Sequence, residues 1–229
     1  ILELFINMND QKVLEKQSIK NMLQQDIKSS VNFIFKEKIV LSKLVFITCI
    51  LNAFISSLMM IGLPILITEN LMFPAEMYGV ATGILALGGL LGGVVINVLK
   101  WKIEKLYALF LMLMIALILL FVAPFVQEIK VLSYLLIVMS SFFVMNIATI
   151  LSIMIITYIQ AHVPKEITGK VIAFLLTLSI CSQPLGQLVY SFAFEYGKGY
   201  ESCIIFIAIM VTFFTAVYTK YHLPKFLTH

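Results

Sequence analysis

YGVATGILALGGLLGGVVINVLK, from Tyr78 to Lys100, is the stretch that decides the fold class. Residues 79–99 carry no charge, and about 20 apolar residues suffice for a helix to cross the hydrocarbon core of a bilayer. In water, each glycine here would weaken a helix by about 1 kcal/mol relative to alanine. In a bilayer the backbone must satisfy its own hydrogen bonds, so a helix forms despite that cost. We therefore expect a transmembrane helix.

Six glycines fall within the charge-free part of this stretch, Gly79 at its start and five further along. Gly88 and Gly92 are four residues apart, which places them on one face of a helix, and Gly89 and Gly93 form a second such pair. Small residues let a neighbouring helix approach closely. The pattern predicts either a tight helix contact or a smooth face that moves during gating. The residues assigned to this role are Gly83, Gly88, Gly89, Gly92 and Gly93.

The composition of the whole chain agrees with a membrane protein. Of its 229 residues, 61% are hydrophobic and 12% are charged, with a mean hydropathy of +1.04, whereas soluble domains carry about 25% charged residues. The 16 basic residues are all lysines and form no dense patch with exposed aromatics, so no nucleic-acid partner is expected. Cys49, Cys181 and Cys203 lack metal-ligand spacing. They are interpreted as small core residues, and no metal site is predicted.

Six apolar runs, each near the length of a membrane span, follow a polar N-terminal segment. We expect residues 1–43 to be a cytoplasmic and interfacial segment, and residues 44–229 to be an all-α domain of six transmembrane helices. The expected spans are about 44–67, 78–99, 106–126, 131–159, 171–194 and 202–218.

The lysines predict the orientation in the membrane. A cytoplasmic N-terminus places 14 of the 16 lysines on the inside and leaves only Lys130 and Lys198 outside, as the positive-inside rule requires. We therefore expect a multi-pass protein with both termini of this segment in the cytoplasm.

The spans also indicate a repeat of three plus three helices with inverted topology, an arrangement common in transporters. The first span of each triplet carries polar residues at helical spacing. The fifth span carries one more polar candidate, Gln183. These side chains either make ordinary hydrogen bonds between helices, worth about 0.6 kcal/mol each, or line a substrate cavity. The candidates for the cavity are Asn52, Ser56, Asn146, Thr149, Ser152 and Gln183.

The fifth span mirrors the glycine-rich second span, because it too has an unusual backbone. Pro184 removes one helical hydrogen bond and predicts a kink, and Gly186 follows it. Both residues are assigned to helix contact or gating.

Three stretches together resemble the C-terminal half of a major facilitator superfamily (MFS) transporter of the bacterial drug-efflux kind. They are LPILITENLMFPAEMYGVATGILALGGLLGG, VPKEITGKVIAF and PLGQLVYSFAFE. The resemblance implies that residues 1–43 hold much of the central loop and that the partner is an N-terminal six-helix half, in the same or a separate chain. It implies export of small amphipathic molecules or drugs across the plasma membrane, hence multidrug resistance. The chain departs from the family in the loop after the second span, where only Lys100, Lys102 and Lys105 stand for a basic motif.

The interior of the spans holds no Asp, Glu, Lys or His. An intramembrane protease needs such residues, so no enzymatic activity and no cofactor are expected. Proton coupling also needs an embedded acid or histidine, which the resemblance would place in the other half, with a proton or ion gradient as the energy source. The alternative function is a non-catalytic permease subunit that needs a partner half.

Overall fold

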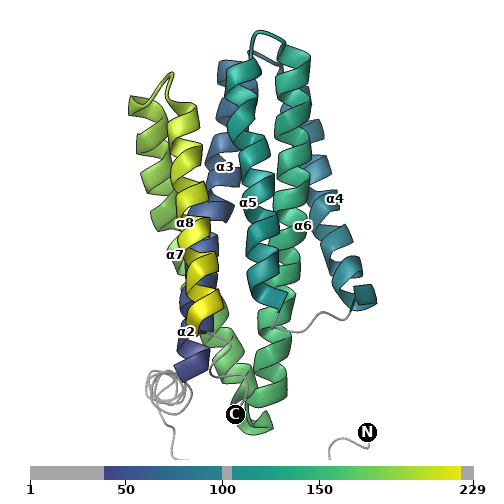
Figure 1. Cartoon of the computed structure of the whole chain (residues 1–229), viewed down its shortest axis with the longest axis vertical. Coiled ribbons are helices and arrows are strands. Elements are labelled where there is room, and N and C mark those ends of the chain that lie inside the picture. Colours follow the sequence, from purple (N-terminus) through teal and green to yellow (C-terminus); the bar gives the residue numbers. More distant parts are fainter. Residues whose placement is uncertain (1–38, 100–104, 223–229) are drawn as a thin grey trace, which may run out of the picture.

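The computed structural model describes residues 39–99 and 105–222, and within these ranges every regular element is helical. Six helices are long and apolar enough to cross a membrane, which confirms the predicted all-α polytopic fold. Figure 1 shows them as one bundle, with α4 at one edge and the pair α7 and α8 at the other. The predicted segment 1–43 lies almost wholly outside the described residues.

The first span is one continuous helix built from four segments. It comprises α2 (Ile39–Ile50), η4 (Leu51–Ser56), α3 (Ser57–Pro64) and η5 (Ile65–Asn70). The segments η4 and η5 are π-helical, with the wider turn that often marks functional sites. The span ends where Met72 adopts a positive φ of 56°, since a left-handed residue cannot continue the helix.

The other five spans follow in antiparallel order through short connections. They are α4 (Ala75–Leu99), α5 (Leu106–Val122) with the 3-10 turn η7 (Ala123–Val126), α6 (Lys130–His162), α7 (Lys165–Tyr196) and α8 (Glu201–His222). Most of these helices extend beyond the predicted apolar runs, because their first and last turns carry polar or charged residues that the hydropathy pattern leaves out. The helix α7 is assigned as a single element that runs through Pro184.

The pairing of the helices follows the predicted three-plus-three repeat. The first span packs on α7, α4 packs on α6, and α5 packs on α8. The repeat relates the first span to the fourth (α6), the second (α4) to the fifth (α7) and the third (α5) to the sixth (α8). Under this relation the pair of the first span with α7 becomes the pair of α6 with α4, and the pair of α5 with α8 becomes itself. One departure is that α5 packs along α6, whereas α8 touches the first span mainly at η4, and a groove of about 270 Å³ lies between α8 and α2.

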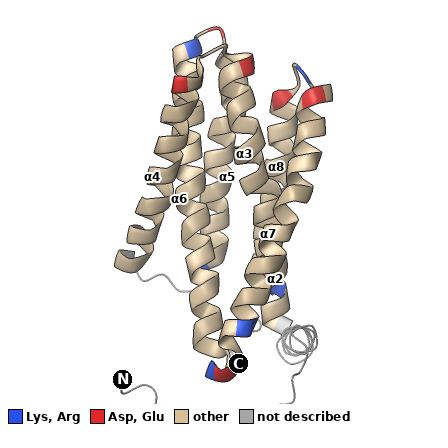
Figure 2. Ribbon diagram, turned by 180° about the vertical axis from the view of Figure 1, so that it is seen from behind, with Lys and Arg blue, Asp and Glu red and all other residues tan. Residues whose placement is uncertain are grey.

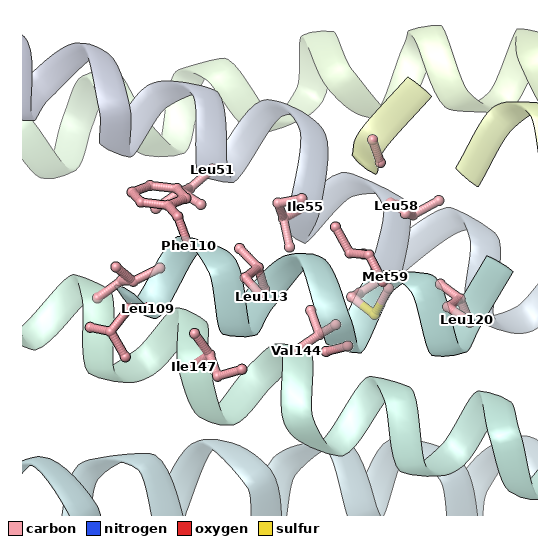
Figure 3. Packing of buried hydrophobic residues seen from close by; sticks show 14 of the residues in the cluster. Leu51, Ile55, Leu58, Met59, Leu109, Phe110, Leu113, Leu120, Val144 and Ile147 are labelled. Carbon is pink, nitrogen blue, oxygen red and sulfur yellow. The ribbon is translucent and has the colours of Figure 1, made fainter. Parts of the chain in front are cut away.

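The hydrophobic core lies where the first span, α5 and α6 meet. Figure 3 shows side chains from these three elements interdigitating, among them Ile55, Phe110 and Val144. All three are buried, and Phe110 is the largest side chain that is fully enclosed. In contrast, α4 and α7 each bury only 22% of an apolar stretch of 18 residues, whereas the first span buries 50% of its corresponding stretch. These two helices therefore keep open faces.

Charged side chains gather at the two ends of the bundle, as Figure 2 shows. At the lysine-rich end the described residues are Lys43, Lys105, Lys165, Glu166, Lys170 and Lys220. At the glutamate-rich end they are Glu69, Glu76, Glu128, Lys130, Glu195, Lys198 and Glu201. The described helices carry no charge between these ends, which is the distribution expected of a bundle that crosses a bilayer.

Candidate functional site: the contact between the first span and α7

The first span and α7 approach so closely that backbone touches backbone. A Cβ at Gly186 would overlap the carbonyl oxygen of Ala53 in η4 and the hydroxyl of Ser57. Two serine hydroxyls add hydrogen bonds across the contact: Ser57 Oγ lies 2.9 Å from the Gln183 carbonyl oxygen, and Ser182 Oγ lies 3.0 Å from that of Cys49. The π-helical segment therefore touches α7 through its backbone, and the two serine hydrogen bonds attach the α-helical residues on either side of it to α7.

Beside this contact, α7 carries one polar residue per turn towards the glutamate-rich end. We call these residues, Gln183, Gln187, Ser191 and Glu195, the polar track; their spacing of four places them along one side of the helix. The track extends for about 18 Å at 1.5 Å per residue. Ser191 and Glu195 are exposed, and the two glutamines are half-buried.

The first span faces the inner part of the polar track with a methionine. Met60 Sδ lies 2.9 Å from Gln187 Nε2 and 3.7 Å from Gln183 Nε2. Because a thioether sulfur is a weak acceptor, these contacts do not replace the hydrogen bonds that an amide makes in water. Met60 follows Ser56 by four residues on the helix, and that spacing was the signal in the sequence that could have found it.

The outer part of the polar track opens into a cavity of about 890 Å³. Its walls combine apolar side chains such as Ile61, Ile65 and Phe194 with Thr68 and Ser191. Glu69, Glu195, Glu201 and Lys198 stand around it at the glutamate-rich end. The cavity is therefore amphipathic, and its charged groups are predominantly acidic.

The two residues predicted from the first span lie in η4, the segment that packs on α7. Both Asn52 and Ser56 are half-buried. The Asn52 amide donates within its own helix, to the Thr48 carbonyl at 3.0 Å. Together with Gln183, these residues form one group at the contact between the first span and α7.

The predicted residues of α6 form a second group, on the side of α4. Asn146 Nδ2 donates to the Gly88 carbonyl oxygen at 3.1 Å, so this amide makes an interhelical bond. Thr149 donates to the Met145 carbonyl within α6 and faces Gly89, while Ser152 is half-buried one turn further on. The described structure thus distributes the predicted cavity residues between two helix contacts.

The glycines of α4 differ in what they face. A Cβ at Gly88 would overlap the Phe142 carbonyl oxygen of α6, and one at Gly92 would overlap that of Asn146. Gly89 faces the side chains of Met145 and Thr149, and Gly93 has only Ile153 nearby. Gly83 faces open space. The close contact between α4 and α6 thus depends on two of the five glycines that were assigned to helix contact or gating.

Four further side chains, one tyrosine and three cysteines, are relevant to the chemistry of the bundle. Tyr190, on the buried side of α7, is 4% exposed, and its hydroxyl has no hydrogen-bond partner among the described residues.

The interpretation of the cysteines as core residues is wrong for Cys181 and Cys203, which are exposed, and Cys49 is half-buried. An apolar run in a membrane span includes residues that face outwards, so membership of such a run does not place a side chain in the core.

In the part of the chain that the structure describes, no group of three or more His, Cys, Asp or Glu side chains is arranged to hold a metal ion. The site can therefore bind a ligand through hydrogen bonds to its amide and hydroxyl groups and through contact with its apolar walls. Its carboxylates lie only at the outer end. Comparisons of the chain with protein-family models, with curated proteins and with solved structures gave no match.

Proposed function

We propose that this six-helix bundle is one half of a secondary transporter of the MFS type, with its substrate path along the polar track. The observation that carries the proposal is the placement of Gln183 and Gln187 in a membrane span, where the Met60 thioether is their one side-chain hydrogen-bond partner among the described residues. Transferring an amide from water to a hydrocarbon environment costs about 4–8 kcal/mol without a compensating hydrogen bond. Such side chains therefore belong against water, substrate or another polar surface.

The distribution of lysines supports an orientation for this path. Lysines concentrate at the end of the bundle where α2 begins and α8 ends, and the positive-inside rule assigns that end to the cytoplasm. Both ends of the described chain would then be cytoplasmic, in a plasma membrane. The 890 Å³ cavity would open on the opposite, outer side, which suits release of an exported substrate.

The open faces of α4 and α7 support the need for a second half. Transporters of this kind bind substrate between repeated units that rock against each other, and these two helices are the equivalent second members of the two triplets. Their exposed apolar residues, such as Leu90 on α4 and Leu185 on α7, would pack against an N-terminal six-helix half. That half is the partner we propose, in the same or a separate chain.

The cavity lining supports small amphipathic molecules as the substrates. Apolar walls at Ile61 and Phe194 stand beside hydroxyl and amide groups, a mixture typical of ligand pockets. A proton or ion gradient would supply the energy. The bundle has no proposed catalytic role.

A permease subunit that only supports a partner is the second candidate. It is favoured by the bonds of Asn146, Ser57 and Ser182, each of which joins one helix to the backbone of another. Under this alternative the polar track would contact the partner and would not line a substrate path.

Replacing the glutamines of the polar track tests the proposal. Gln183→Leu and Gln187→Leu, separately and together, would be compared in cells that express the chain with its adjoining half, by accumulation of a panel of fluorescent dyes and antibiotics. We expect the variants to restore accumulation at unchanged membrane expression. Thr177→Val is the matched control, because Thr177 is exposed on α7 away from the track and bonds only within its own helix. Normal export by the double variant would contradict the proposed path.

A further inference from the structure

A groove of about 590 Å³ lies between α4, α5 and α6, apart from the polar track. Its volume is within the range of about 300–1,000 Å³ that ligand sites occupy. Met112 and Ile115 of α5 and Phe143 of α6 line it, and all three are exposed on the outside of the bundle. The groove therefore opens sideways, towards the surroundings of the bundle.

The groove follows the axis of α5. The residues of α5 that line it run from Leu109 to Val122, which corresponds to about 20 Å at 1.5 Å per residue. Because α5 crosses the bundle from the lysine-rich to the glutamate-rich end, a ligand in the groove lies along the direction in which the helices cross the bilayer. This shape fits an extended chain.

The lining accepts an aliphatic ligand and nothing charged. Among its twelve residues, Asn146 is the single polar one. The amide nitrogen of Asn146 already donates a hydrogen bond to the Gly88 carbonyl oxygen, so Asn146 does not need a hydrogen-bond acceptor on the ligand. No other side chain of the lining forms a hydrogen bond.

A lysine lies about one helical turn before the first groove-lining residue of α5. Lys105 immediately precedes α5 and is exposed. It lies four residues before Leu109 and seven before Met112, which places it on the same face of α5 as the groove. Lysines near a bilayer surface attract anionic lipid headgroups.

We propose that this groove binds an acyl chain of an anionic phospholipid, with the lipid phosphate beside Lys105. The apolar lining, its direction along α5 and the cation one turn beyond its end together select a ligand with one long aliphatic part and one anionic part. The site is independent of the proposed transport path, which lies between the first span and α7.

Retention of lipid by the purified full chain tests this proposal. Native mass spectrometry would count bound phosphatidylglycerol and, separately, phosphatidylcholine with the same acyl chains. Lys105→Gln removes the cation, with Lys130→Gln at the opposite end as its control. Met112→Trp fills the groove, with Leu111→Trp as its control, since Leu111 is exposed on the adjacent position of α5 and does not line the groove.

We expect phosphatidylglycerol to be retained in preference to phosphatidylcholine, and Lys105→Gln to weaken its retention about fivefold. Met112→Trp should weaken retention of both lipids, while the two controls leave it unchanged. Equal retention of the two lipids, or equal effects of each variant and its control, would overturn the proposal. Displacement of phosphatidylglycerol by an equal concentration of inorganic phosphate would also overturn it, because the ligand would then be a free anion at Lys105.

Discussion

Gly186 of α7 lies against the carbonyl oxygen of Ala53 in η4, with no room for a Cβ between them. The same relationship recurs on the other side of the bundle, where Gly92 of α4 meets the Asn146 carbonyl oxygen of α6. In each case the second helix of one triplet places a glycine on the backbone of the first helix of the other triplet. The three-plus-three repeat is therefore visible at the level of single atoms as well as in the order of helices.

Gly186→Ala should destabilise the protein, and Gly83→Ala should not. At position 186 the added methyl group meets backbone atoms of Ala53 that cannot rotate away, and overpacking of this kind costs about 1–3 kcal/mol. At position 83 no atom lies within 4 Å of the new Cβ, while alanine favours the helix by about 1 kcal/mol. Thermal unfolding in detergent compares the two variants, and equal unfolding temperatures would contradict the prediction.

Asn146→Leu should lower stability by about 0.6 kcal/mol, and by no more than about 1.7 kcal/mol, the range measured for polar contacts between membrane helices. The lost interaction is the bond from Asn146 Nδ2 to the Gly88 carbonyl oxygen. Denaturant unfolding in mixed micelles gives the free energy. Thr149→Val serves for comparison, because Thr149 bonds only within α6; a larger loss in Thr149→Val would argue against the interhelical bond.

Ser57→Ala and Ser182→Ala should each weaken the attachment of α7 to the first span. Each serine hydroxyl reaches a carbonyl oxygen across the contact, those of Gln183 and Cys49 respectively. We expect each variant to lose about 0.6 kcal/mol of unfolding free energy. If the double variant is no less stable than either single variant, the two bonds do not both contribute.

A cysteine at Ser191 should react with a membrane-impermeant maleimide added to intact cells, and a cysteine at Leu188 should not. Ser191 lines the 890 Å³ cavity, whereas Leu188 is an exposed apolar residue outside it. The background chain carries alanine in place of Cys49, Cys181 and Cys203. Labelling of Ser191→Cys only after the cells are permeabilised would reverse the proposed orientation, and no labelling at all would mean that water does not enter the cavity.

The hydropathy of the chain was sufficient to predict six membrane helices, because charge-free runs such as residues 79–99 leave few alternatives. Helical periodicity then predicted which residues share a face, as for Gly88 and Gly92. The same periodicity separates Gly83 from that face. Gly83 precedes Gly88 by five residues, so the two lie about 140° apart around the axis of an α-helix. The structure places Gly83 in open space, away from the contact that the other two make.

Periodicity does not reveal which neighbour a face meets. The sequence placed Asn52 and Asn146 at matched positions, but it could not show that one amide bonds within its helix and the other bonds Gly88. Met60 was overlooked because methionine counts as apolar, although its sulfur meets two amides of α7. The π-helical segments were also missed, since their sequences, LNAFIS and ILITEN, have no local signature that separates them from an α-helix.

The π-helical turn at Leu51–Ser56 has an evolutionary consequence. A π turn of this kind behaves as an α-helix into which an extra residue has been inserted, and the insertion rotates everything beyond it by about 100°. A descendant that lost one residue between Leu51 and Ser56 would keep a continuous helix and the same apolar composition. Its Met60, Thr68 and Glu69 would then turn away from α7. A single deletion here could change what the bundle recognises while leaving its hydropathy profile the same.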